Sequence, residues 1–265
     1  MNKNTGNCDN KKNIKLILAY DGSSYAGWQR LGSLTGKPSV QSVVEQSLSA
    51  YLDEDIKVIG SGRTDAGVHA LGQTANFLCY SCRSPADIKT AVNAILPEDI
   101  KILHAQEADQ SFHSRYSARA KTYEYRIAQG EVQSVFTRRY MYHVTEYLDL
   151  SAMEKAAGFF LGTHDFKAFS TDRKDGKSTV RTIEAVKIRT YRNTAGRNPC
   201  FEVRISITGD GFLYNMVRII IGTLIEIGKG TRQPEEILRI FETRDRGAAG
   251  VTVSSQGLFL MEVRY

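Results

Sequence analysis

The chain has 265 residues, and 35 Lys and Arg against 29 Asp and Glu give it a net charge of +6. Apolar residues make up 42% of the chain and charged residues 24%, which is typical of a globular protein and excludes wholesale disorder, a collagen-like repeat and a membrane bundle. The length suits two modest domains, and the cationic excess favours a polyanionic partner.

The N-terminal segment, residues 1–13, is polar and contains no apolar run. A secretory signal needs such a run, so we expect a polar tail and a cytoplasmic protein. Cys79 and Cys82 form a C-x-x-C pair, but no second pair of ligands stands at a suitable spacing. A structural zinc site needs four ligands, so we expect two reduced thiols at a strand end and no metal.

The first part of the chain alternates short apolar strands with amphipathic helices. Pro38 and Ser39 are predicted to open the first helix. Ser84 is the predicted N-cap of the second helix, and Pro85 is its predicted first residue. The predicted strands are residues 14–20, 56–60, 74–80 and 100–105. The order strand–helix–strand–strand–helix–strand is that of a ferredoxin-like domain, which we expect to cover residues 14–108.

The pattern restarts after residue 108. Residues 121–128 alternate, with Tyr123 and Tyr125 on one face of the predicted strand. The other predicted elements are strands at 139–144, 180–189, 201–207 and 258–265, and helices at 150–161, 213–227 and 234–241. Residues 109–265 therefore predict a second α+β domain with mainly antiparallel strands.

A glycine-rich segment, GSGRTDAGVHALGQ at residues 60–73, is the strongest candidate for a functional loop. Four glycines within thirteen residues allow close approach of the backbone to other groups. A dinucleotide-binding fingerprint is excluded because Asp65 stands at its third glycine position and would repel a pyrophosphate. The segment leaves two interpretations open: a surface hairpin in which Arg63 pairs with Asp65, or a loop that presents Asp65 for catalysis.

The segment 60–73 resembles the corresponding loop of the tRNA pseudouridine synthase A (TruA) family. The resemblance extends over most of the chain, in several blocks that stand in the family's order. These blocks are YDGSSYAGWQR (20–30), VNAILPEDI (92–100), SFHSRYSARAKTYEYRI (111–127), GFLYNMVRIIIGTL (211–224) and QGLFLMEVRY (256–265). The chain departs from the family at GVTVSS (250–255) and in an insertion at residues 31–37.

The resemblance implies an α+β protein of two ferredoxin-like or RRM-like domains, with mainly antiparallel sheets flanked by helices and a catalytic cleft between them. It implies conversion of uridine to pseudouridine in the anticodon arm of tRNA, at positions thirty-eight to forty, by a homodimer without a cofactor. The chemistry agrees with this, since the base leaves through N1 and rejoins through C5 without net oxidation or hydrolysis, so no metal or nicotinamide is required.

The resemblance assigns Asp65 as the nucleophile, or essential carboxylate. Arg218 is its expected partner, because Arg218 lies between apolar residues of a predicted helix and a buried charge needs a counter-charge; the alternative is a surface arginine whose stem packs on apolar neighbours. Tyr123 is expected to stack on the target base and Leu258 to line the uracil, although each also fits an ordinary core position.

The expected RNA contacts are cationic and aromatic side chains. Phosphate contacts from Lys and Arg position RNA without reading its sequence. Arg63 either contacts phosphate or fills the space that a flipped nucleotide leaves. The other expected RNA-binding residues are Arg83, Phe112, His113, Arg115, Tyr116, Lys174 and Lys177. Two further functions stay open: a non-catalytic tRNA-binding or folding protein, and an enzyme that hydrolyses the base from its sugar.

Overall fold

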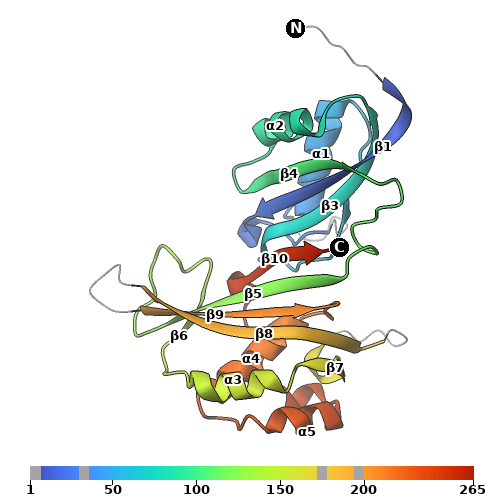
Figure 1. The fold of residues 1–265 in the computed structure, drawn as a ribbon. Helices are drawn as coiled ribbons and strands as arrows, with labels where there is room; N and C mark the ends of the chain where they lie inside the picture. The colour runs from blue at the N-terminus through green and yellow to red at the C-terminus, as the bar shows by residue number, and fades with distance from the viewer. Residues whose placement is uncertain (1–6, 30–35, 172–177, 194–199) are drawn as a thin grey trace. The chain divides into compact units, whose positions relative to one another are not determined.

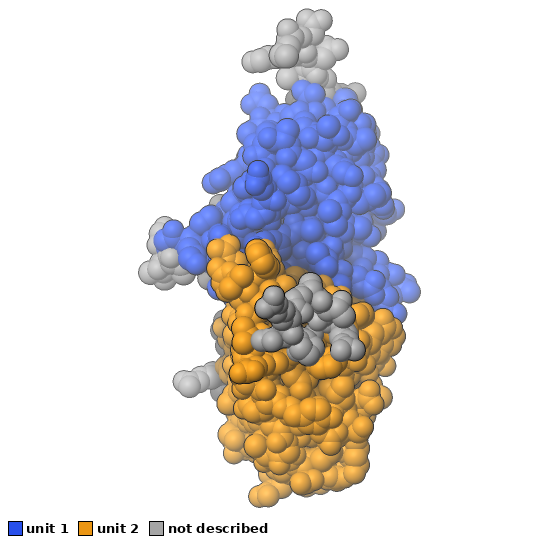
Figure 2. Space-filling view, turned by 90° about the vertical axis from the view of Figure 1, so that its left-hand side faces the viewer, with its two compact units in different colours: residues 1–119, 260–265 blue, residues 120–259 orange. Residues whose placement is uncertain are grey.

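The computed structural model describes residues 7–29, 36–171, 178–193 and 200–265 (Figure 1). Their contacts divide the chain into two units, coloured blue and orange in Figure 2. Unit 1 comprises Met1–Arg119 with Leu260–Tyr265, and unit 2 comprises Ala120–Phe259. The last residues of the chain thus belong with the N-terminal half. The expected boundary between two domains at residue 108 stays a prediction.

Unit 1 contains the strands β4-β1-β3-β10 in that order, β10 from Leu260 onward, and two helices. β1 pairs antiparallel with both β3 and β4, and β2 pairs antiparallel with β3. The elements are β1 (Asn7–Tyr20), α1 (Val40–Leu52), β2 (Ile59–Gly60), β3 (His69–Ser81), α2 (Pro85–Ile95), β4 (Ile100–Ala108) and β10 (Leu258–Arg264). The predicted order of strands and helices is confirmed.

Both helices of unit 1 begin where the sequence predicts. The Ser39 hydroxyl accepts a hydrogen bond from the Ser42 N–H at 3.1 Å, and the Ser84 hydroxyl accepts one from the Asp87 N–H at 3.1 Å. These caps satisfy backbone donors that the first helical turn leaves without a partner. The apolar stripes of the helices are buried together with the inward side chains of β1 and β3, among them Val44, Leu48, Ile88, Val92, Ile14, Leu16, Leu18 and Phe77.

Some strand limits differ from the prediction. β1 begins at Asn7, because the polar residues before Ile14 pair with β3 through their backbone (Asn7↔Ser81, Lys12↔Cys79), which an apolar pattern cannot show. The prediction that both C-x-x-C cysteines are reduced is wrong. Cys79 is free and buried in the core face of β3, but Cys82 is disulfide-bonded.

Unit 2 contains a sheet with strand order β5-β9-β8-β7, in which every pair is antiparallel, and the short β6 pairs parallel with β5. The elements are β5 (Ala120–Gln129), β6 (Tyr142–Val144), α3 (Leu150–Gly158), β7 (Gly162–Asp165), β8 (Val180–Asn193), β9 (Cys200–Gly209), α4 (Met216–Gly228) and α5 (Glu236–Thr243). The α+β class with mainly antiparallel strands is therefore confirmed, whereas the cleft between two domains stays a prediction.

Two details of unit 2 differ from the sequence prediction. α4 begins at Met216 and not at residue 213, because Asn215 has φ 62° and this left-handed conformation interrupts the helix. β7 was not predicted, since four residues without an apolar pattern give no periodic signal. Throughout the described ranges, none of the helices combines the length and the apolar character that crossing a bilayer requires.

Candidate active site

Asp65 lies on the loop between β2 and β3, and backbone hydrogen bonds fix this loop on both sides of it. The Ser61 N–H donates to the Thr74 carbonyl at 2.8 Å, and the Trp28 N–H donates to the Thr64 carbonyl at 3.0 Å. The Val68 N–H closes a turn by donating to the carbonyl of Asp65 itself at 3.1 Å. Asp65 is half-buried. The loop therefore presents this carboxylate from a fixed backbone.

Hydrogen bonds from buried polar side chains also hold this loop. Gln73 and Ser61 are both fully buried. The Ser61 hydroxyl donates to Gln73 Oε1 at 2.7 Å, and Gln73 Nε2 donates to the Gly62 carbonyl at 3.1 Å. The hydroxyls of Tyr20 and Thr64 share a hydrogen bond of 2.8 Å. Buried polar groups are costly unless they are paired, so these contacts hold the loop in one conformation.

Two glycines, Gly22 and Gly27, allow the segment before α1 to approach the Asp65 loop closely. A Cβ on Gly22 would lie 2.0 Å from the carbonyl oxygen of Val68. Gly27 has φ 100°, and a Cβ there would lie 2.5 Å from the carbonyl oxygen of Thr64. Any larger residue at either position would push the loop away, on one side of Asp65 or on the other.

His69, at the start of β3, is almost completely buried beside this block, with 1% of its surface exposed. Its Nδ1 lies 3.1 Å from Asp21 Oδ1 and 3.2 Å from the Gly22 N–H. His69 therefore supports the backbone around Gly22. Sequence reasoning missed the supporting roles of His69, Tyr20 and Gln73. A polar side chain inside an otherwise apolar strand was the feature that could have indicated them.

The expected RNA-binding residues of unit 1 have different surroundings. Arg63 is exposed. Arg83 is half-buried, with its guanidinium 4.6 Å from the centre of the Tyr51 ring and Nη1 donating to the Tyr51 hydroxyl at 3.3 Å. Arg83 is thus fixed on an aromatic ring, as a cation–π pair, whereas Arg63 extends into solvent.

Phe112 forms an aromatic cluster with the C-terminal residue, Tyr265. The two ring centres are 4.9 Å apart, and Lys15 Nζ lies 5.0 Å and 4.3 Å from the centres of the Phe112 and Tyr265 rings. The Tyr265 hydroxyl donates to the Ser114 carbonyl at 2.8 Å. Burial raises the pKa of Tyr265 to about 12 and lowers the pKa of Lys15. Sequence reasoning did not identify Lys15 or Tyr265, because this cluster joins distant segments.

The next residues of the same turn form a second, more exposed group. The rings of His113 and Tyr116 are 4.3 Å apart, and the Arg115 guanidinium lies 5.9 Å from the centre of the Tyr116 ring. His113 Nδ1 accepts hydrogen bonds from the backbone N–H groups of Arg115 and Tyr116. Tyr116 is 79% exposed, so its ring and the Arg115 cation are accessible to a ligand.

In unit 2, Tyr123 and Tyr125 share one face of β5 but have different environments. Tyr125 is fully buried, and its hydroxyl donates to the Ser254 carbonyl at 2.8 Å. Tyr123 keeps 8% of its surface exposed and contacts Phe212 edge-to-face, with ring centres 5.2 Å apart. Tyr125 is therefore a core residue, and Tyr123 lies closer to the surface. Leu258 is buried, with 6% of its surface exposed.

Arg218, on α4, is half-buried although its neighbours Val217 and Ile219 are buried. The side chain is therefore neither fully buried nor a fully exposed surface arginine, and it turns back towards the N-terminal start of α4. Nε donates to the Val253 carbonyl at 2.7 Å, and Nη1 donates to Asn215 Oδ1 at 2.9 Å. These bonds fix the guanidinium. Since Asp65 belongs to unit 1 and Arg218 to unit 2, their ion pair stays a prediction.

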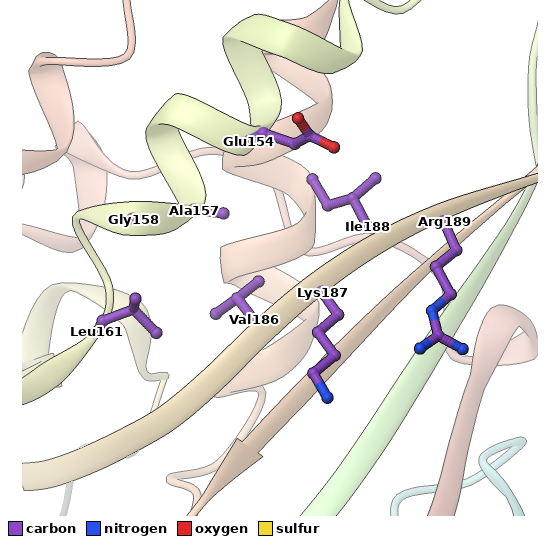
Figure 3. Close-up of a pocket in the computed structure, with 8 residues that line it drawn as sticks. All are labelled: Glu154, Ala157, Gly158, Leu161, Val186, Lys187, Ile188 and Arg189. Atoms are coloured by element: carbon purple, nitrogen blue, oxygen red, sulfur yellow. The ribbon is translucent and has the colours of Figure 1, made fainter.

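Other parts of the structure do not add to this site. Lys174 and Lys177 lie outside the described residues. A cavity of about 400 Å³ lies between α3 and β8, and Figure 3 shows the side chains that line it, among them Ala157, Val186 and Ile188. None of the predicted site residues lines this cavity. Over the described part of the chain, no group of three or more His, Cys, Asp or Glu side chains is arranged to hold a metal ion.

Comparisons with known proteins identify the class to which the chain belongs. Residues 16–117 and 156–265 match the family model described as tRNA pseudouridine synthase. This match places the chain in the tRNA pseudouridine synthase class.

Full-length relatives identify the family within this class. The chain is 43% identical to tRNA pseudouridine synthase A of Acetivibrio thermocellus over 254 residues, which are 96% of this chain and 100% of the relative. It is 43% identical to tRNA pseudouridine synthase A 2 of Clostridium tetani, over 96% of this chain and 99% of the relative. The chain belongs to the tRNA pseudouridine synthase A family.

Proposed function

We propose that this chain isomerises uridine to pseudouridine in tRNA, with Asp65 as the essential carboxylate. The observation that carries the proposal is the loop of Asp65. Backbone hydrogen bonds fix this loop on both sides of Asp65, and the buried hydrogen bond between Ser61 and Gln73 fixes it further. The names of its relatives supply the substrate class, since they describe tRNA pseudouridine synthases.

The reaction is an exchange of two bonds at one sugar carbon. The bond from C1′ to N1 of uracil breaks, a bond from C1′ to C5 forms, C5 loses its proton and N1 gains one. An ionised carboxylate can assist as a nucleophile towards C1′ or the base, or by accepting a sugar proton. Each of these routes requires that Asp65 be ionised and fixed beside the target nucleotide.

The remaining predicted residues have supporting roles in the proposal. Arg218 holds the Asp65 carboxylate in its charged form, because an opposite charge within a few ångströms lowers a carboxyl pKa. Its two hydrogen bonds to Val253 and Asn215 fix the guanidinium in advance. Tyr123 stacks on the target base, and Leu258 provides an apolar surface beside it.

The substrate is proposed to be the anticodon arm, at positions thirty-eight to forty, bound by a cytoplasmic homodimer without a cofactor. Arg63 acts at the flipped nucleotide. Arg83 and the cluster of Phe112, His113, Arg115 and Tyr116 bind the RNA backbone and bases; Lys174 and Lys177 are proposed to add phosphate contacts. The net charge of +6 supports a polyanionic partner.

The test compares the wild-type protein with Asp65→Asn on an unmodified anticodon stem-loop transcript. Chemical labelling of pseudouridine should detect product with the wild-type protein and none with the variant. Asp55→Asn is the matched control, because Asp55 is an exposed carboxylate that pairs only with Lys57 at 2.6 Å in the described structure. Normal product formation by Asp65→Asn contradicts the proposal. Free uracil would indicate hydrolysis, and RNA binding by the wild-type protein without product would indicate a binding protein.

A further inference from the structure

Residues 130–141 connect β5 to β6 in unit 2 (Figure 1). Several apolar side chains of this connection are exposed to solvent. Phe136 is 89% exposed, Val135 63% and Val132 59%. Single exposed apolar residues are common in proteins, but three neighbouring ones on one loop, with a phenyl ring at the tip, indicate a contact surface.

Hydrogen bonds fix the turn that carries Phe136. The N–H groups of Thr137 and Arg138 both donate to the Ser134 carbonyl, at 3.3 Å and 3.1 Å, and the Tyr140 N–H donates to the Thr137 carbonyl at 2.9 Å. The Phe136 N–H donates to the Ser134 hydroxyl at 3.3 Å. These bonds fix the backbone of residues 134–140, here called the Phe136 turn, so the turn presents the Phe136 ring to solvent from a defined backbone.

The Phe136 turn is attached to the segment that leads to Leu258. Gln256 Nε2 donates to the carbonyls of Arg138 at 3.2 Å and Met141 at 3.0 Å. The same segment accepts the hydrogen bond of Arg218 at Val253. The Phe136 turn and two proposed active-site residues of unit 2, Arg218 and Leu258, are therefore held by one short stretch of chain, residues 253–258.

The charges of the turn indicate the chemistry of its ligand. Arg138 and Arg139 are both exposed, and residues 133–141 contain no acidic residue. An exposed aromatic ring next to two guanidinium groups suits an unpaired nucleotide, because the base stacks on the ring while the cations contact phosphates. A purely apolar partner would gain nothing from desolvating the two arginines.

We propose that the Phe136 turn binds an unpaired nucleotide of the RNA substrate outside the target position. Phe136 stacks on the base, and Arg138 and Arg139 contact the adjoining phosphates. This inference rests on the proposed function, since it assumes an RNA substrate whose loop contains unpaired bases.

The test uses a fluorescent reporter in a protein that binds RNA without turnover. Trp28, the only tryptophan, is buried with 2% of its surface exposed, so Phe136→Trp in an Asp65→Asn background adds an accessible indole. An anticodon stem-loop RNA should quench the new fluorescence and protect it from acrylamide. The matched control is Tyr147→Trp in the same background, since Tyr147 is 79% exposed on the same unit, and its fluorescence should not change.

Affinity measurements give a second, independent result. Phe136→Ala should weaken binding of the stem-loop on the order of ten-fold or more, whereas Phe136→Tyr should stay within about two-fold of wild type. Replacing both Arg138 and Arg139 with Gln should flatten the salt dependence of binding by about one unit of slope per arginine.

Several outcomes overturn the inference. The inference is wrong if Phe136→Ala binds the RNA as tightly as the wild-type protein. It is also wrong if bound RNA does not change the indole fluorescence of the Phe136→Trp variant. Conversion of the protein to a smaller oligomer by Phe136→Ala, at unchanged RNA affinity, would assign the turn to an interface between copies of the chain. Failure of the proposed function is distinguishable, because it appears as missing pseudouridine while RNA binding and quenching persist.

Discussion

The buried pair of Ser61 and Gln73 provides the sharpest test of how the Asp65 loop is held. Gln73→Leu removes the hydrogen bond from the Ser61 hydroxyl at 2.7 Å and the one to the Gly62 carbonyl at 3.1 Å, and also the hydrogen bond between Gln73 and the Tyr20 hydroxyl. Each buried group that loses a partner costs about 1 to 3 kcal/mol. The substitution should therefore lower the free energy of unfolding by about 3 kcal/mol, and Ser61→Ala by about 1.5 kcal/mol.

The double variant separates this pair from its surroundings. When Ser61 and Gln73 are both replaced by apolar residues, the Ser61 hydroxyl no longer faces an apolar side chain, and the Tyr20 hydroxyl keeps its hydrogen bond to Thr64. The loss should then be about 1.5 kcal/mol smaller than the sum of the single losses. Urea denaturation at equilibrium measures all four free energies. Because the loop carries Asp65, Gln73→Leu should also lower kcat while KM changes little.

A control cycle combines Ser61→Ala with Thr223→Val. Thr223 lies in α4 of unit 2, where its hydroxyl donates to the Ile219 carbonyl at 2.9 Å, and the two losses should add within about 0.5 kcal/mol. If the Ser61 and Gln73 losses were equally additive, the hydrogen bond between them would not be what holds the loop, and the reasoning would be refuted.

Two further predictions concern packing and pH. Gly222→Ala should lower the free energy of unfolding by several kcal/mol, as overpacking a core does, because the added Cβ would lie 1.9 Å from the Val251 carbonyl oxygen. Thermal or urea unfolding measures this loss. Gly158→Ala, where a Cβ meets nothing within 4 Å, should stabilise α3 by about 0.5 to 1 kcal/mol; equal effects of the two substitutions would contradict this. Burial raises the pKa of Tyr265 to about 12 from its usual 10.0, so its contribution to stability is complete below pH 10 and is lost as the pH rises towards 12. The stability difference between wild type and Tyr265→Phe, about 1 kcal/mol at pH 8, should therefore shrink towards pH 12, and a constant difference would count against the assignment.

Local pattern was sufficient wherever a residue's role depends on its immediate neighbours in the chain. Ser84 caps its helix as predicted, and the first helix begins beside Ser39 as predicted, because the start of a helix depends only on the next few residues. The alternation in β5 correctly placed Tyr123 and Tyr125 on the buried face. The pattern did not distinguish the two tyrosines, since the complete burial of Tyr125 and its hydrogen bond to the distant Ser254 carbonyl are visible only in the folded structure.

Pattern was insufficient wherever distant segments meet. The polar start of β1 pairs with β3 through backbone groups, which are the same for every residue type except proline. Gln256 donates hydrogen bonds to the Phe136 turn, although more than one hundred residues separate the two segments in the sequence. The periodicity of neither segment predicts that contact.

The amino-acid sequence by itself determined the order of strands and helices, the family and the candidate carboxylate, because caps, alternation and motifs are properties of neighbouring residues. Only the tertiary structure decided that Gly22 and Gly27 enclose the Asp65 loop, that Tyr265 joins Phe112, and that an exposed phenyl ring is attached to the segment before Leu258. These contacts depend on how the backbone brings remote residues within a few ångströms, and that distance is set by the packing of the whole unit.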